Sequence, residues 1–104
     1  MAEDLKSDPR YKTLSTKRAK AKRKITMYLN KLNEADSEQE SYSALVARFL
    51  KNIENNLQEV IQCNNNIAEL AKNFENIDSF IETEDSAAIA YVIHIEEKIV
   101  NYQT

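Results

Sequence analysis

The sequence predicts an all-α fold, an antiparallel three-helix bundle that resembles a coiled coil and has a long central helix. The first observation behind this prediction is that the 104 residues include no glycine and a single proline. Hairpin turns and strand bulges depend on glycine, because it adopts positive φ at little cost. The second is that positions 46–81 carry mostly apolar residues at alternating steps of three and four, the a/d spacing of a helix that buries a narrow seam. The length suits one domain spanning residues 1–104.

The first helix is expected at residues 9–33. Residues 1–8 are polar, and we expect them to be disordered. In the pair Asp8-Pro9, the aspartate carboxylate can cap the helix, and proline fits the first helical turn because its missing N–H has no partner there. The apolar residues that follow keep heptad spacing, with Arg18 in one seam position.

The central helix is expected at residues 37–72, after a connection so short that this helix must run antiparallel to the first. Its start is predicted by a capping box, Ser37-Glu38-Gln39-Glu40, in which side chains satisfy free backbone N–H groups. The heptad phase continues beyond this range and would extend the helix to residue 82. Against that extension, the Asn64–Asn66 run and Lys72-Asn73 are weak helix formers, which favour a bend or a break.

The third helix is expected at residues 84–102. The segment Thr83-Glu84-Asp85-Ser86 places acidic side chains at the positive end of a helix, which is typical of a helix start. From Ala87 to Ile95 every residue is apolar except His94. A helix that is hydrophobic nearly all the way round is either central or shared with a partner.

The two forms of the central helix predict different assemblies. A continuous helix leaves part of its seam uncovered within one chain, so a second chain would have to cover it. A break near Ala71–Glu75 would instead let three helices of similar length close a monomeric bundle. We favour the continuous form, and with it a homodimer or an association with another helical protein. The predicted interface comprises the seam and two residues of the third helix: Val46, Phe49, Ile53, Asn56, Val60, Cys63, Ile67, Leu70, Phe74, Ile77, Ile81, Tyr91 and Ile95.

Asn56 is the polar residue of this seam. A buried asparagine at an a/d position penalises misaligned partners, which cannot satisfy its amide, and so sets the register of a coiled coil. A hydrated seam that merely tolerates the amide explains the same residue equally well. The sequence leaves both interpretations open.

Charge is unevenly distributed along the chain. Residues 1–34 carry ten Lys/Arg against four Asp/Glu, and the remainder carries four against thirteen, which gives the net charge of −3. We expect these opposite charges to orient the helices. Six of the eight residues from 17 to 24 are cationic, enough to neutralise several phosphates. They are the candidate nucleic-acid site: Lys17, Arg18, Lys20, Lys22, Arg23 and Lys24. On a helix these cations are expected on both flanks of the apolar stripe and not in one strip, and no aromatic residues interleave for base stacking. We therefore treat nucleic acid, or an anionic membrane surface, as an alternative partner.

Catalytic chemistry is not predicted. Cys63 and His94 are the only residues of their types, and one of each cannot form a structural zinc site. Both have apolar neighbours, so we interpret them as a packed thiol and a packed or interface imidazole. The absence of glycine excludes the P-loop and the dinucleotide-binding fingerprint. We therefore expect no enzyme activity, no metal and no cofactor.

The sequence also predicts an intracellular location, cytoplasmic or nuclear. A single cysteine cannot form an internal disulfide, which suits a reducing compartment. The first residues lack the apolar core of a signal peptide. No run approaches the roughly 18 apolar residues of a membrane span.

The basic tract that leads into Lys24-Ile25-Thr26 resembles the opening helix of the Gag-like polyprotein region of BEL/Pao-type retrotransposons. Three later runs follow in a similar order and spacing: Leu45–Arg48, Ile67–Leu70 and Ile95–Ile99. The resemblance covers most of the chain and implies an N-terminal helical segment of a self-assembling structural polyprotein, or a host protein derived from one. The Asn-rich region from residue 64 to 76 is longer than the corresponding region between the second and third helices of that family.

The leading hypothesis for function is therefore a non-catalytic, self-associating helical module, a Gag-like structural protein. One alternative is a nucleic-acid-binding domain that uses the basic first helix. The other is an adaptor that accepts a partner helix in the uncovered groove.

Overall fold

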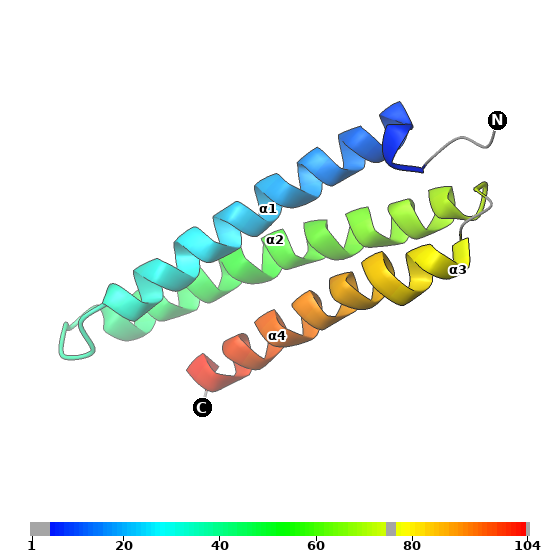
Figure 1. The fold of residues 1–104 in the computed structure, drawn as a ribbon. Helices are drawn as coiled ribbons and strands as arrows, with labels where there is room; N and C mark the ends of the chain where they lie inside the picture. Colours follow the sequence, from blue (N-terminus) through cyan, green and yellow to red (C-terminus); the bar gives the residue numbers. More distant parts are fainter. Residues whose placement is uncertain (1–4, 75–76, 104) are drawn as a thin grey trace.

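A computed structural model shows long helices packed side by side into an elongated bundle, with Cα extents of 61 × 22 × 16 Å (Figure 1). The structure describes residues 5–74 and 77–103. Within these residues the backbone is helical or turn and contains no strand, so the predicted all-α class is confirmed. The elements in chain order are a 3-10 helix Leu5–Ser7, α1 Pro9–Glu34, α2 Tyr42–Ala71, α3 Ile77–Phe80, a π-helical turn Ile81–Asp85 and α4 Ser86–Gln103.

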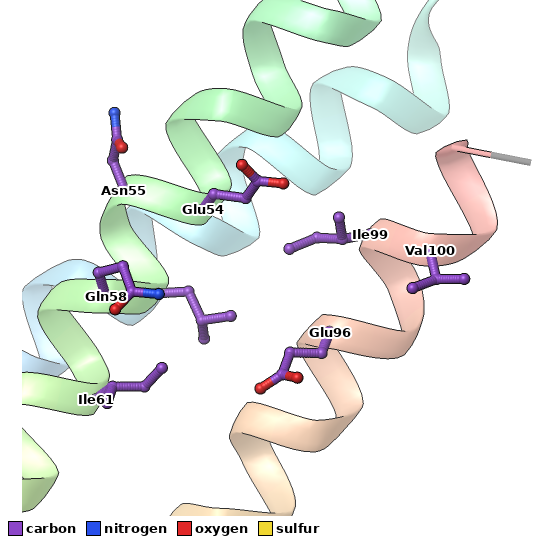
Figure 2. Close-up of a pocket in the computed structure, with 8 residues that line it drawn as sticks. Glu54, Asn55, Gln58, Ile61, Glu96, Ile99 and Val100 are labelled. Atoms are coloured by element: carbon purple, nitrogen blue, oxygen red, sulfur yellow. The ribbon is translucent and has the colours of Figure 1, made fainter.

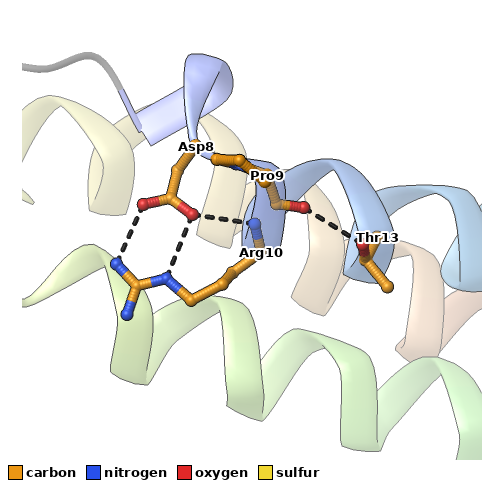
Figure 3. Close-up of polar contacts among 4 residues, drawn as sticks. All are labelled: Asp8, Pro9, Arg10 and Thr13. Carbon is orange, nitrogen blue, oxygen red and sulfur yellow. Dashed lines mark hydrogen bonds and ion pairs between the residues drawn. The ribbon is translucent and has the colours of Figure 1, made fainter.

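The start of α1 lies where the Asp8-Pro9 pair predicted it. The Asp8 carboxylate accepts the Arg10 side-chain Nε and Nη2 at 3.1 and 2.9 Å, and the Arg10 backbone N–H at 2.8 Å (Figure 3). These hydrogen bonds hold the pKa of Asp8 below its ordinary value. Disorder was predicted for residues 1–8, whereas Leu5–Ser7 form a 3-10 turn and Leu5 packs against an apolar cluster. Residues 1–4 lie outside the described part of the chain.

The connection between α1 and α2 is longer than predicted. Because α2 begins at Tyr42, the capping box predicted from residue 37 is wrong. The Asp36 side-chain carboxylate accepts a hydrogen bond from the Glu38 N–H at 3.0 Å. The Asp36 backbone carbonyl accepts one from the Gln39 N–H at 3.1 Å. A short polar side chain that bonds nearby backbone competes with helix formation, and here it holds the segment in a turn.

The continuous central helix that we favoured is wrong, because α2 ends at Ala71. The N–H groups of Asn73 and Phe74 donate hydrogen bonds to the backbone carbonyls three residues earlier, at 3.1 and 3.0 Å. This spacing tightens the last turn and ends the helix. The Asn64–Asn66 run stays helical. The alternative, a break at this end of α2 that lets three helices close one bundle, agrees with the structure; residues 75–76 lie outside its described residues.

The predicted third helix, residues 84–102, agrees with α4 to within two residues. It does not start afresh at Thr83–Ser86, however, because the backbone is already helical from Ile77. The turn between α3 and α4 is π-helical, and within it the Ser86 hydroxyl donates to the Ile81 carbonyl at 2.9 Å. A π turn inserts one residue into the helical phase. Phe80 packs against the core, whereas Ile81 is 49% exposed.

The core consists of two buried clusters. The larger cluster draws residues from all three long helices: Ala21, Ile25, Leu32, Leu50, Ile53, Leu57, Val60, Ile95 and Ile99. The smaller one lies toward the end of the bundle where α2 ends: Tyr11, Ile67 and Leu70. The seam predicted for the central helix is thus largely buried, but other helices of the same chain bury it.

Candidate interaction surfaces

The residues predicted to form a subunit interface lie mainly inside the single-chain bundle. Six are buried: Ile53, Val60, Cys63, Ile67, Leu70 and Ile95. Six are half-buried: Val46, Phe49, Asn56, Phe74, Ile77 and Tyr91. The remaining one, Ile81, is exposed. Because α1 and α4 cover the seam, it cannot serve as an interface between chains while the bundle is closed.

Asn56 satisfies its amide within its own helix. Its Nδ2 donates to the Asn52 carbonyl at 2.8 Å, and the side chain is half-buried. An amide bonded to the preceding turn does not select the register of a partner helix. This geometry favours a tolerated polar seam residue over a register device.

The thiol of Cys63 and the imidazole of His94 lie in different environments. Cys63 is 2% exposed, and burial raises the pKa of its thiol, although the nearby Lys17 opposes the shift. A buried, protonated thiol is a poor nucleophile. His94 is exposed on α4, so the prediction that its imidazole is packed is wrong for the single chain. An interface role for His94 stays a prediction.

Part of the basic cluster turns inward and ties α1 to α2. The Lys17 Nζ lies 3.1 Å from the Glu59 carboxylate, and this hydrogen bond raises the pKa of Lys17. The Arg18 guanidinium, in its predicted seam position, donates to the Asn64 side-chain oxygen at 3.0 Å. These two cations are therefore engaged within the chain, but only Lys17 meets an opposite charge, because the partner of Arg18 is a neutral amide.

Lys22 ties α1 to α4. Its Nζ lies 4.4 Å from the centroid of the Tyr91 ring, which is a cation–π contact. Burial lowers the pKa of Lys22 and raises the pKa of Tyr91, whose buried hydroxyl lacks a hydrogen-bond partner among the described residues. The Tyr102 hydroxyl donates to the Asn33 side chain further along the same two helices. These contacts set α1 and α4 side by side and running in the same direction.

The other three cations, Lys20, Arg23 and Lys24, are exposed. Lys20 and Lys24 each lie two residues from Lys22, which is about 200° around a helix, so both point away from α4. Met27 continues this side of α1 and is 43% exposed. We call these four residues, Lys20, Arg23, Lys24 and Met27, the basic face of α1.

The outer side of α4 is apolar and uncovered. Ile89, Ile93 and Val100 are 53, 51 and 54% exposed, and we call them the apolar stripe of α4. Their spacing of four and seven residues places them on one side of the helix. Sequence reasoning missed these residues as a site. The available signal was the nearly continuous apolar run from residue 87 to 95, which cannot face one core with every side chain.

A shallow groove of about 500 Å³ runs between α2 and α4 beside the apolar stripe (Figure 2). Its lining residues are Glu54, Asn55, Leu57, Gln58, Ile61, Glu96, Ile99 and Val100. Aliphatic side chains come from both helices. The carboxylates of Glu54 and Glu96 point toward the gap between the helices in Figure 2. The groove therefore combines apolar surface with an acidic rim.

Comparison with known proteins yields no match, since no family model, curated protein or solved structure is significantly similar to this chain. The Gag-like resemblance stays a prediction. No helix in residues 5–74 or 77–103 is long and apolar enough to cross a membrane. The described residues also hold no group of three or more His, Cys, Asp or Glu side chains placed to bind a metal ion. Function must be inferred from the basic face of α1 and the α4 surfaces.

Proposed function

We propose that this chain is a non-catalytic helical module that associates with copies of itself, in the manner of a structural protein. The observation that carries the proposal is the apolar stripe of α4, three large aliphatic side chains that are each about half exposed. Exposed apolar area costs roughly 25 cal/mol per Å² relative to its burial. Single exposed aliphatic residues are common, but three on one side of a helix, here with Glu96 and Glu97 beside them, suit an interaction surface that has an apolar centre and a polar border. Association would remove this row from water.

The side-chain chemistry supports a non-catalytic role. Nucleophilic catalysis needs a nucleophile beside a base, in a site that excludes water. Cys63 is buried and its pKa is raised, while His94 is exposed to solvent on α4. The groove carboxylates Glu54 and Glu96 line an open surface. The proposed module therefore needs no cofactor and no metal, and a Gag-like descent is the origin we propose for it.

Mass measurement by light scattering across a wide concentration range tests the proposal. The weight-average mass should rise above the 12.0 kDa of one chain as concentration increases. Replacing two stripe residues, Ile93→Gln with Val100→Gln, should return the mass to that of one chain. The matched control is His94→Gln with Lys98→Gln, because these residues are exposed on another side of the same helix. A wild-type chain that stays monomeric at high micromolar concentration would contradict the proposal.

Nucleic-acid binding through α1 is the second candidate function. The observation that favours it is the placement of Lys20, Arg23 and Lys24 on one exposed side of the helix. Titration of RNA or DNA at several salt concentrations tests it, because log K should fall with log salt by about 0.9 for each phosphate contacted on a duplex. Binding that ignores salt, or that persists when the three cations are neutralised, would rule out this use of the basic face.

A further inference from the structure

The groove between α2 and α4 carries like charges on its two walls. Glu54 comes from α2 and Glu96 from α4, and both carboxylates point toward the same gap (Figure 2). The ion pairs identified in the bundle use other carboxylates: Asp8, Glu59, Glu69 and Glu84. Carboxylates on both walls give the groove a negative potential, which attracts a cationic group. The groove thus favours a basic occupant.

The apolar stripe has an acidic border as well. Ile93 and Glu97 each lie two residues from the buried Ile95, or about 200° around the helix, so both lie on the outer side of α4. A hollow of about 340 Å³ joins them to Val100 and Glu96. The occupant of this surface must therefore present apolar atoms together with positive charge.

A second α4 does not meet this requirement. Packing two apolar stripes against each other would bring the glutamates at 96 and 97 of both copies to one interface. Like charges placed against each other disfavour an interface. The same chain, however, presents a helix of complementary character.

The basic face of α1 has the required chemistry and length. Lys20, Arg23 and Lys24 are exposed cations, and Met27 supplies an exposed, flexible apolar side chain. The steps from residue 20 to 27 and from residue 93 to 100 are both seven residues, about 10 Å of helix. The two surfaces therefore match in charge and in apolar content, and the basic face is as long as the part of the stripe from Ile93 to Val100.

We propose that the basic face of α1 in one copy docks on the apolar stripe and acidic groove rim of α4 in a second copy. This inference rests on the proposed self-association and names the surface that each copy contributes. Met27 lies against the aliphatic side chains in such a contact, while the three cations face the carboxylates of Glu54, Glu96 and Glu97. Each interface brings together a basic helix of one copy and an acidic groove of the other.

Such a contact is head-to-tail. Lys20 and Lys24 point away from α4 because Lys22 points toward it, whereas the groove lies on the other flank of α2. One copy therefore presents its two surfaces in different directions, and a pair of copies still has one basic face and one groove unoccupied. Heterologous contacts of this kind form rings or open chains and do not end at a dimer. The structure thus favours assembly beyond the homodimer predicted from the sequence.

Charge reversal on either surface tests the docking. The α1 variant is Lys20→Glu with Arg23→Glu and Lys24→Glu, and the α4 variant is Glu96→Lys with Glu97→Lys. All five residues are exposed, so circular dichroism should report unchanged helix content. Each variant alone should associate at least about tenfold more weakly than the wild type, because it places like charges across the contact. Mixing the two variants should restore the larger mass.

A mixture of two variants that each keep only one working surface tests whether the contact is head-to-tail. The α1 variant keeps a working groove, and Ile93→Gln with Val100→Gln keeps a working basic face. Mixed in equal amounts, the two should form a complex that stops at two chains, or twice 12.0 kDa, at concentrations where the wild type grows further. An interface made of two identical α4 stripes predicts instead that the α1 variant forms dimers by itself and that the stripe variant does not join them, and that result would overturn the head-to-tail contact.

Two further variants separate the possible failures. Lys20→Arg with Arg23→Lys and Lys24→Arg preserves charge and should associate like the wild type. Glu96→Gln with Glu97→Gln should weaken a head-to-tail contact but strengthen pairing between two α4 helices. If the wild type associates and the α1 charge reversal has no effect, the docking is wrong and self-association stands. If the wild type remains monomeric at high micromolar concentration, both proposals fail.

Discussion

The helices α1 and α4 both pack on α2 and run in the same direction, yet their solvent-facing sides differ in kind (Figure 1). The outer side of α1 carries Lys20, Arg23 and Lys24, which water solvates well. The outer side of α4 carries Ile93 and Val100, which water does not. The solvent-facing side of α1 is mainly charged, whereas the solvent-facing side of α4 leaves aliphatic side chains uncovered. The difference indicates that α4 is where association would lower the free energy most.

The inner contacts of the two helices differ as well. Ile25 of α1 is fully buried, and Lys17 and Arg18 add polar contacts to α2. The helix α4 buries three of its 18 residues, a share similar to that of α1, which buries four of 26. Its polar contacts to α1 run through Lys22 and Tyr102. Substitutions should therefore separate the core that the three long helices share, which carries the stability of the bundle, from the outer side of α4, which carries the proposed association.

The largest effect on stability is expected in the core shared by the three long helices. Ile53 is 0% exposed and belongs to the cluster shared by all three long helices. Ile53→Ala removes buried methyl groups and leaves a cavity, so the free energy of unfolding should fall by about 2–5 kcal/mol. Urea unfolding followed by circular dichroism measures the change. A loss as small as that of an exposed α4 residue would contradict the division between the two regions.

A smaller effect, of opposite sign, is expected where α4 meets α1. The buried Tyr91 hydroxyl lacks a hydrogen-bond partner among the described residues, so Tyr91→Phe should raise the free energy of unfolding by about 1 kcal/mol. The ring remains, and with it the contact to Lys22. Tyr102→Phe is the matched control, because its hydroxyl donates to Asn33 and its loss should not stabilise the protein. Equal effects of the two substitutions would mean that the Tyr91 hydroxyl is satisfied.

Low pH should reduce the stability that the Asp8 cap gives to the start of α1. The pKa of Asp8 is lower in the folded protein than in the unfolded chain, so the unfolded state binds the proton more tightly. The stability contributed by Asp8 is thus present above the ordinary carboxyl pKa and is lost as pH falls through the lowered value. Thermal unfolding over acidic pH should show a flatter pH dependence for Asp8→Asn, which keeps a capping oxygen but cannot titrate. Asp8→Ala should flatten the curve and also lower the melting temperature at neutral pH.

The smallest effect on stability is expected for the apolar stripe. Ile93→Ala shortens a side chain that is 51% exposed, so the free energy of unfolding of the monomer should change by no more than about 0.5 kcal/mol. Dilute protein is needed for this measurement, because association would add its own stabilisation. A loss comparable to that of Ile53→Ala would show that Ile93 is packed within the monomer.

Several features followed from the sequence alone. The absence of glycine and the a/d spacing predicted an all-helical chain, and the Asp8-Pro9 pair predicted where α1 begins. These predictions succeed because caps and helical periodicity are local properties of the chain. The seam spacing also identified five of the eight residues that α2 buries, and it left out Leu50, Leu57 and Ala71.

Only the tertiary structure decided which helices cover that seam. A heptad phase continues through residues 72–74 whether or not the chain turns there, so periodicity could not reveal that α2 ends at Ala71. Ile81, the last seam position of that phase, lies in the π turn and is exposed, which no spacing rule anticipates. Which cations of α1 face outward, and which side of α4 stays uncovered, likewise depend on how three helices meet. Local preferences form each helix, but its partners are chosen by packing between residues far apart in the sequence.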